Sequence, residues 1–171
     1  PRDRVIREIT EKHIRKVKIP RNEDGTYACQ FDIAIDPGYL PSAYAVLWVA
    51  SWDTPDGKFW YVFDELYEQE MMNETVIQWV KDHKFYKYLN QDNLTIDISA
   101  KAHKDGNEPS AEKYRRLTKL KSPYMKYWHE KALIDRIRMT GHQNLIAIHP
   151  NCQGLIAELG LGEEVFPDMH A

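Results

Sequence analysis

Residues 31–38 read Phe-Asp-Ile-Ala-Ile-Asp-Pro-Gly, and their pattern sets the fold expected for this chain. Bulky apolar residues alternate here with polar or small ones at a period of two, which indicates a strand buried on one face. Pro37 and Gly38 end the strand, because proline lacks the N–H that would continue the hydrogen-bond ladder and glycine favours turns. Asp36 is therefore predicted to lie at the carboxyl end of a buried strand.

In the rest of the sequence, patterns of the same kind predict a mixed α/β chain. Apolar and β-branched runs separated by turn residues predict further strands over 43–50, 59–66, 94–98 and 145–149. Helices are predicted to begin at Asn73, near Ser110, at Ser122-Pro123 and at Asn151, with Asn73, Ser122 and Asn151 as N-cap residues. Because a helix connects the third and fourth strands, the fourth is predicted to lie parallel to the first. The expected sheet has five strands, three antiparallel and then two parallel, flanked by helices.

Length and composition describe an ordinary globular domain. The chain has 171 residues, of which 43% are hydrophobic and 29% charged, and this excludes a disordered tail, a collagen-like fibre and a disulfide-dense miniprotein. Cys29 and Cys152 form no metal-type pair, so a reducing cytosol is expected. No apolar run reaches the roughly 20 residues of a membrane span. Because the chain begins with proline, we expect it to be a fragment of a longer protein.

The charges are segregated along the sequence, although the net charge is only −3. Residues 1–21 carry eight Lys/Arg against three Asp/Glu, and residues 111–138 carry nine against three. Residues 53–74 instead carry seven acids against Lys58 alone. A protein that binds nucleic acid through basic flanks and keeps an acidic pocket for cations has this pattern. Solvated helix faces are the alternative interpretation of each run.

Two acids end predicted strands, and these are the candidates for chemistry. Asp36 follows Ile33-Ala34-Ile35 and Asp97 follows Leu94-Thr95-Ile96. If the first and fourth strands are parallel neighbours, both carboxylates emerge at one edge, about 5 Å apart. Two negative charges at this short distance need a divalent cation between them, and oxygen ligands favour Mg²⁺ or Mn²⁺ over Zn²⁺. Asp168, at the start of a predicted further helix, is available as a third acid, while a turn or cap role is the alternative for each.

Four segments in this order resemble the C-terminal nuclease domain of phage terminase large subunits, over about residues 29–171. The segments are 31–38, 61–67 (YVFDELY), 97–100 (DISA) and 148–152 (IHPNC). The resemblance implies an RNase H-like, RuvC-type fold that cuts concatemeric double-stranded DNA with two divalent metal ions. Residues 1–28 are then a basic arm or interdomain linker with the start of the domain, and 29–171 the nuclease domain, which stops before the family's last helix.

The resemblance also implies roles for individual residues. The family's first and second acids match Asp36 and Asp97, and its third matches Asp168 within Asp168-Met169-His170-Ala171. Asp36 would bridge two ions about 3.5 to 4 Å apart, with Asp97 on one and Asp168 on the other.

The residues themselves, apart from the resemblance, add further candidates. Glu65, at the end of the third predicted strand, is expected to bind a metal through water, with an exposed strand-end acid as the alternative. The cations expected to contact DNA phosphates are Lys101, Lys113, Arg115, Arg116, Lys119 and Lys121, joined by His103, Arg136 and Arg138 as further candidates.

Three functions remain open on the sequence. The first is a metal-dependent endonuclease of a genome-packaging terminase, acting in the host cytoplasm. Its partners by resemblance are an N-terminal ATPase domain, the portal and the small terminase subunit, with no membrane involved. The second is another RNase H-like nuclease, such as a Holliday junction resolvase. The third is a non-catalytic nucleic-acid-binding module of the same fold, in which the acids only stabilise strand ends. No G-x-x-x-x-G-K-[ST] loop occurs in the chain, so it does not itself supply ATPase work.

Overall fold

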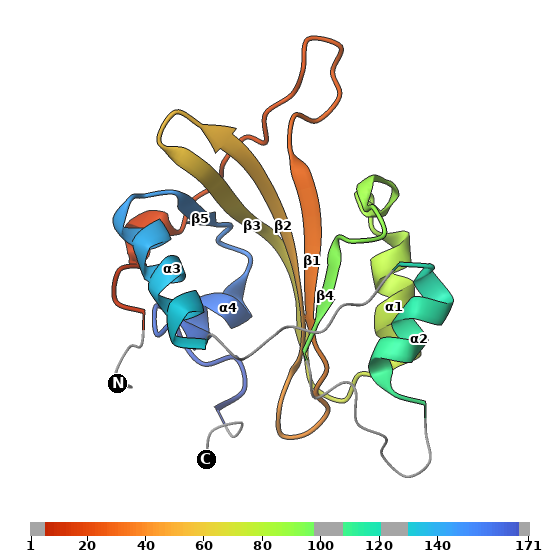
Figure 1. The fold of residues 1–171 in the computed structure, drawn as a ribbon. Helices are drawn as coiled ribbons and strands as arrows, with labels where there is room; N and C mark the ends of the chain where they lie inside the picture. Colours follow the sequence, from red (N-terminus) through yellow and green to blue (C-terminus); the bar gives the residue numbers. More distant parts are fainter. Residues whose placement is uncertain (1–5, 98–107, 121–129, 168–171) are drawn as a thin grey trace. The chain divides into compact units, whose positions relative to one another are not determined.

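The computed structural model describes residues 6–97, 108–120 and 130–167 (Figure 1). Five strands form one mixed sheet in the order β4-β1-β2-β3-β5. They are β1 (Gln30–Asp36), β2 (Tyr44–Thr54), β3 (Gly57–Glu68), β4 (Leu94–Ile96) and β5 (Ile146–Ile148). β4 lies parallel to β1, and β5 lies parallel to β3. The predicted fold class, a mixed five-stranded sheet with helices, is therefore confirmed.

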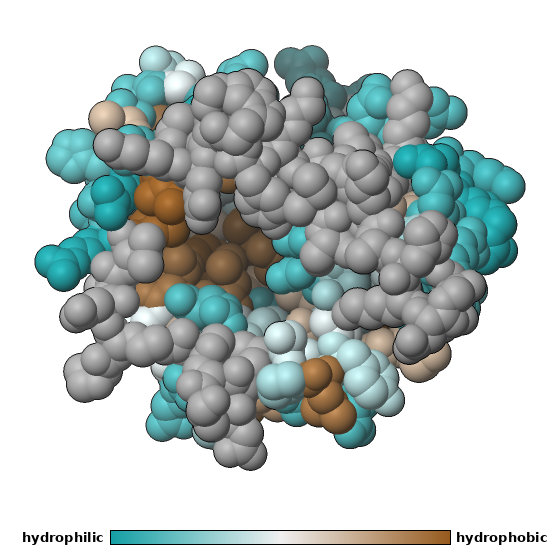
Figure 2. Space-filling view, turned by 60° about the horizontal axis from the view of Figure 1, so that its bottom comes forward, coloured by the Kyte–Doolittle hydropathy of each residue, from teal (hydrophilic) through white to brown (hydrophobic). Residues whose placement is uncertain are grey.

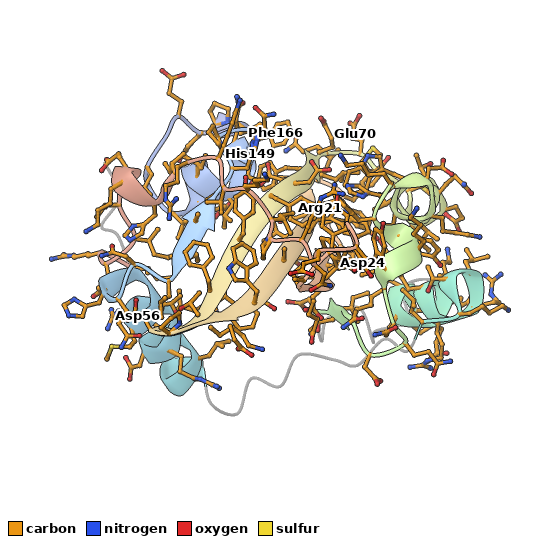
Figure 3. All side chains as sticks on the ribbon, turned by 90° about the horizontal axis from the view of Figure 1, so that it is seen from above. Arg21, Asp24, Asp56, Glu70, His149 and Phe166 are labelled. Atoms are coloured by element: carbon orange, nitrogen blue, oxygen red, sulfur yellow. The ribbon has the colours of Figure 1, made fainter. Side chains whose placement is uncertain are left out.

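The chain folds as two compact units. Unit 1 comprises the described parts of residues 1–30, 48–65 and 127–167, and unit 2 comprises those of 31–47 and 66–126. β2 and β3 are longer than predicted, because their ladder continues to a two-residue turn at Pro55 and Asp56. Asp56 is labelled in Figure 3 and lies at the tip of this hairpin.

Unit 2 packs two helices against the start of the sheet. α1 (Asn73–Asp82) buries Val76, Ile77 and Val80, and α2 (Ser110–Thr118) lies beside it in Figure 1. Phe31 of β1 stacks on Phe85 with ring centroids 4.7 Å apart. η2 (Tyr86–Tyr88) is a separate short turn after α1. The apolar spacing of α1 thus buries one face of the helix, as the sequence predicted.

Unit 1 contains β5 and most of β2 and β3. It contains η1 (Glu11–His13), α3 (Glu130–His142) and α4 (Gln153–Glu158). Ile14 forms a parallel bridge with Ile148, and the Arg15 N–H donates to the Ile148 carbonyl at 3.0 Å. The basic N-terminal stretch therefore lies along the edge of β5. A core cluster of Phe59, Tyr61, Leu145 and Ala147 fills this unit, with Val17, Ile19, Trp52 and Phe63 packed against it.

Two of the predicted helix caps are wrong. The N-cap of α1 is Met72, and the N-cap of α4 is Cys152, neither with a side-chain cap bond. The side chain of Asn73 is instead engaged by Tyr44 and Ser110. A distant side chain, Glu65, binds the first N–H groups of α4. These hydrogen bonds could not be predicted from the local sequence, because the partners lie tens of residues apart in the chain. The predicted start at Ser122-Pro123 lies outside the described residues.

The tryptophans of β2, β3 and α1 differ in burial. Trp48 is fully buried, Trp79 is half-buried, and Trp60 is 38% exposed. Trp60 is exposed because it lines an open pocket in unit 1.

Among the described residues, no helix is both long enough and apolar enough to span a bilayer.

Candidate active site

Asp36 and Asp97 lie at the carboxyl ends of two neighbouring parallel strands in unit 2. The register pairs Ile35 with Ile96, so the next residues, Asp36 and Asp97, follow at the same level. The Asp97 N–H donates to the Ile35 carbonyl at 2.9 Å, which extends the ladder to this point. The prediction that these two strands are parallel neighbours is confirmed, and it brings the two acids to one edge of the sheet.

The alternation of the strands places both acids on the same face. Ile33 and Ile35 are buried, as are Leu94 and Ile96, and residues one position along point to the opposite face. Asp36 is exposed and Asp97 is half-buried. Both carboxylates therefore stay within reach of solvent, where a divalent cation can approach them.

The register is held by a polar contact at the other end of β4. The Ile33 N–H donates to the carbonyl of Asn93 at 2.8 Å. The Asn93 side-chain amide donates to Asp32 at 3.0 Å, and its oxygen accepts the Asn90 N–H at 2.6 Å. A slip of one residue would turn Asp97 to the buried face, and these bonds oppose it. This role of Asn93 is not evident from the sequence, where the only signal is an asparagine before a short apolar run.

The third predicted acid, Asp168, lies outside the described residues. Within residues 6–97, 108–120 and 130–167, no three acids, histidines or cysteines are grouped so that they could hold a metal ion. Asp36 and Asp97 offer carboxylate oxygens alone, a donor set that suits Mg²⁺ or Mn²⁺. The described residues thus supply two of the three predicted ligands.

Glu65, the additional metal candidate, has a defined structural role in unit 1. Its two carboxylate oxygens accept the N–H groups of Gly154 and Leu155, each at 2.8 Å. Burial raises the pKa of Glu65, while these two hydrogen bonds oppose the rise. Glu65 therefore caps α4 from β3. Metal binding by this carboxylate stays a prediction.

A buried polar network joins the two helices of unit 2 to β2. The hydroxyl groups of Tyr44 and Tyr114 are 2.7 Å apart, and Tyr44 also donates to Asn73 at 2.8 Å. Asn73 in turn donates to Ser110 at 3.0 Å. Burial raises the pKa of Tyr44, and the negative charges of Glu74 and Asp36 raise it further. Asp36 therefore lies close enough to this network to act on it electrostatically.

The predicted DNA-binding cations of α2 are engaged by acids. Lys113 contacts Glu74 at 2.7 Å, Arg115 contacts Glu112 at 2.5 Å, and Arg116 contacts both oxygens of Glu108 at 3.1 and 2.7 Å. These pairs lower the pKa values of Glu74 and Glu108. Lys119 is exposed at the C-cap of α2. Lys101, His103 and Lys121 lie outside the described residues.

Of the two further cations, Arg138 lies 3.8 Å from both Glu8 and Asp135, and Arg136 lines an apolar pocket of about 430 Å³ in unit 1. The pocket is formed by β2, β3, β5 and α3, and its lining residues are Val49, Trp60, Val62, Leu133, Arg136, Ile137, Thr140 and Ile146. Figure 2 shows apolar residues gathered in a hollow on one face. None of these described lining residues is an acid.

No protein-family model matches the sequence, and no curated protein matches it either. Solved structures do. The chain is similar to the nuclease domain of the P22 large terminase, with 13% identity, a TM-score of 0.60, and 92% of this chain and 78% of that chain covered. The large terminase of a thermophilic bacteriophage aligns with 12% identity and a TM-score of 0.60, covering 92% of this chain and 36% of that one.

The nuclease domain of the bacteriophage SPP1 large terminase, solved with bound Mn, aligns with 15% identity and a TM-score of 0.56. That alignment covers 87% of this chain and 77% of the SPP1 domain. At these identities the comparisons concern the fold. The strand order β4-β1-β2-β3-β5 and these alignments agree with the resemblance found in the sequence. The chain has the RNase H-like fold of phage large terminase nuclease domains.

Proposed function

We propose that this chain is a divalent-metal-dependent endonuclease that cuts double-stranded DNA, as the nuclease part of a phage genome-packaging terminase. The observation that carries the proposal is the register of β1 and β4, which aligns Asp36 with Asp97 at one edge of the sheet. The fold is that of large terminase nuclease domains, one of which was solved with bound Mn. In the cell, we place its action in the host cytoplasm, with an ATPase domain, the portal and the small terminase subunit as partners.

Asp36, Asp97 and Asp168 would hold two Mg²⁺ or Mn²⁺ ions, with Asp36 between them. Bound there, the ions would lower the pKa of the attacking water and neutralise charge on the leaving 3′ oxygen. Asp36 is exposed, so its carboxylate can be shared between an ion and the substrate side of the site. Asp97 is half-buried, and the bond from its N–H to the Ile35 carbonyl fixes its backbone beside β1. Glu65 remains a proposed outer ligand, acting through water.

Phosphate contacts from α2 require an exchange of partners. Lys113, Arg115 and Arg116 each hold a glutamate, and a DNA phosphate would take the place of that carboxylate. Lys101, Lys119 and Lys121 complete the proposed set. Because the side chains of Arg115 and Arg116 are exposed, and exposed ion pairs contribute little stability, this exchange is energetically accessible at these two residues.

The test is nicking of supercoiled plasmid by the full chain in a titration with Mn²⁺ or Mg²⁺. Asp36→Asn and Asp97→Asn are each expected to reduce the nicking rate at least a hundredfold, because each removes one metal-binding oxygen of the site. Asp56→Asn, at the exposed tip of the β2–β3 hairpin, is the matched control and should nick like the wild type. Asp168→Asn tests the third ligand in the same assay.

Other outcomes separate the remaining functions. A wild-type chain that binds duplex DNA but nicks none of it under any divalent metal would support the non-catalytic module. Cleavage of four-way junctions in strong preference to linear duplex would support a resolvase. Nicking that persists in Asp36→Asn would contradict the proposed site.

A further inference from the structure

The loop directly after Asp36, residues 37–43, carries two large apolar side chains on its surface. Tyr39 is 52% exposed and Leu40 is 53% exposed. A single exposed apolar side chain needs no explanation, because much of any protein surface is apolar. Here two consecutive apolar side chains are exposed, and the loop that carries them directly follows Asp36, a candidate catalytic residue.

The backbone of this loop is fixed by the residues that follow β3. The N–H of Glu70 donates to the Tyr39 carbonyl at 3.0 Å, and the side-chain amide of Gln69 donates to the Pro41 carbonyl at 2.5 Å. Gly38 packs so closely that a Cβ there would overlap the carbonyl of Ala43. The loop is therefore tied at three places, while the side chains of Tyr39 and Leu40 stay in solvent.

Glu70, which is labelled in Figure 3 and whose N–H binds the Tyr39 carbonyl, has an unusual backbone conformation. Its φ is 57°, in the left-handed region that glycine adopts readily and a β-carbon disfavours. This conformation accompanies the bond from the Glu70 N–H to Tyr39. Strained residues of this kind persist where the surrounding structure determines them, and they cluster at functional sites.

The position of the loop limits what it can touch. Three residues span at most roughly 10 Å, so the Cα of Tyr39 lies within about that distance of the Cα of Asp36. Successive base pairs of duplex DNA are about 3.4 Å apart along the axis. The Cα of Tyr39 thus lies within about three base-pair steps of a phosphate held at Asp36, and the Cα of Leu40, one residue further along, within about four.

We propose that Tyr39 and Leu40 form an apolar contact with the sugars and base edges beside the phosphate that is cut. This inference rests on the proposed nuclease function and adds a DNA contact that needs no charge. Apolar side chains of this kind insert into the minor groove in several architectural proteins, and aromatic rings stack on bases. A loop with a fixed backbone presents such side chains with little further loss of entropy on binding.

The first test measures binding of a fluorescein-labelled duplex by anisotropy, without divalent metal, across a series of salt concentrations. The double variant Tyr39→Ser, Leu40→Ser is expected to bind about ten times more weakly at every salt concentration. The slope of log Kd against log salt should not change, because apolar contacts release no counterions. Met139→Ser is the matched control, since Met139 is 53% exposed on α3 in unit 1, and it should bind like the wild type.

The second test uses plasmid nicking in Mn²⁺. The double variant is expected to raise KM about tenfold and to leave the Mn²⁺ midpoint unchanged, because the loop contacts DNA and not the ions. Equal binding by the double variant and the wild type would overturn the inference. A shifted Mn²⁺ midpoint would also overturn it, since the loop would then act by moving Asp36.

The two proposals fail separately. If the wild type binds duplex DNA but does not nick it, the nuclease proposal is wrong, and tenfold weaker binding by the double variant still supports the loop contact. If the wild type nicks DNA and the double variant has an unchanged KM, only the loop inference is wrong. If the wild type binds no duplex DNA, both are wrong.

Discussion

Two carboxylates of the sheet, Asp36 of β1 and Glu65 of β3, have different surroundings in the fold. Asp36 is exposed at the end of β1, beside the backbone of Asp97 on the next strand. Glu65 is half-buried, and both of its oxygens accept N–H groups at the start of α4. A carboxylate with both oxygens engaged by the backbone is a poorer candidate for direct metal binding than one at a strand end. Asp36 is therefore the better candidate for metal binding, whereas Glu65 stabilises the start of α4.

Glu65→Gln is expected to lower the free energy of unfolding by about 1–3 kcal/mol, because the amide can accept only one of the two N–H groups of α4. Its NH₂ group would also face a donor. Urea denaturation followed by circular dichroism measures the change. Glu68→Gln, at the exposed end of β3, is the matched control and should change stability little. Equal stability of the two variants would contradict the capping role.

The pH dependence of stability gives a second test of Glu65. Burial raises the pKa of Glu65 above its ordinary value of 4.5, so the folded state keeps this proton to higher pH than the unfolded state. The stability from this shift is fully present below about pH 4.5 and is lost as the pH rises through the raised pKa. The difference in unfolding free energy between the wild type and Glu65→Gln is therefore expected to decrease as the pH rises from 4 to 7. A difference that grows with pH would show a lowered pKa.

At the scale of elements, α1, α2 and β2 are joined by the hydroxyl groups of Tyr44 and Tyr114. Tyr44 has two partners, Tyr114 and Asn73, whereas Tyr114 contacts Tyr44 alone among the hydrogen bonds described above. Both tyrosines are fully buried, so a lost partner cannot be replaced by water without rearrangement. The network fixes the ends of two helices near Asp36.

Tyr44→Phe is expected to destabilise the chain more than Tyr114→Phe, by about 1–3 kcal/mol against about 1 kcal/mol, because it leaves two buried polar groups without a partner. Thermal and urea unfolding of the two variants measure the order. Tyr27→Phe, at a half-buried position in the N-terminal stretch, serves as the control for loss of a hydroxyl group. The reverse order for Tyr44 and Tyr114 would contradict this account of the network.

The N-terminal stretch is attached to α3 by a buried histidine. The Thr10 N–H donates to Nδ1 of His13, so the neutral ring carries its proton on Nε2. Nε2 lies 3.0 Å from the Gly141 carbonyl and 3.1 Å from Oδ1 of Asn144. Gly141 itself has no room for a Cβ, which would lie 2.8 Å from the carbonyl oxygen of Glu8. Within unit 1, the described part of this stretch is thus packed against α3.

His13→Ala is expected to lower the free energy of unfolding by about 2–4 kcal/mol, because it removes a buried ring and leaves the Thr10 N–H without the Nδ1 acceptor. Proteolysis between residues 10 and 20 should become faster, which mass spectrometry of the fragments detects. His142→Ala, at an exposed position on the end of α3, should change neither property. A loosely attached arm would show the same proteolysis in all three proteins.

At the scale of the whole molecule, charge segregation in the sequence is greater than in the structure. Three cations of the basic run that includes α2, namely Lys113, Arg115 and Arg116, form ion pairs with Glu74, Glu112 and Glu108. The field that a DNA phosphate meets at α2 is therefore weaker than the sequence count suggests. Neutralising one of these acids should make the surface more basic while every Lys and Arg stays unchanged.

Glu108→Gln is expected to tighten binding of duplex DNA several-fold at low salt, because it releases Arg116 for a phosphate. The slope of log Kd against log salt should steepen by about one ion, as for one more phosphate contact. Fluorescence anisotropy over a salt series measures both quantities. Glu163→Gln, an exposed acid of unit 1, makes the same charge change elsewhere and should leave the slope unaltered. Equal effects of the two variants would mean that only net charge matters.

The strands, most helices and the placement of Asp36 and Asp97 at strand ends could be predicted from the sequence. The alternation of residues 31–36 and the apolar spacing of Val76, Ile77 and Val80 are local patterns, and each reports which face of its own element is buried. The parallel arrangement of the first and fourth strands also followed, because a crossover of this kind admits few alternatives.

Only the tertiary structure decided how polar groups are partnered. Glu65 binds the N–H groups of Gly154 and Leu155, some ninety positions later, and Asn73 is turned from its expected cap toward Tyr44 and Ser110. The same holds for Glu70, whose N–H reaches back to Tyr39. A hydrogen bond depends on distance and direction in space, and residues far apart in the chain acquire these only when the sheet has formed.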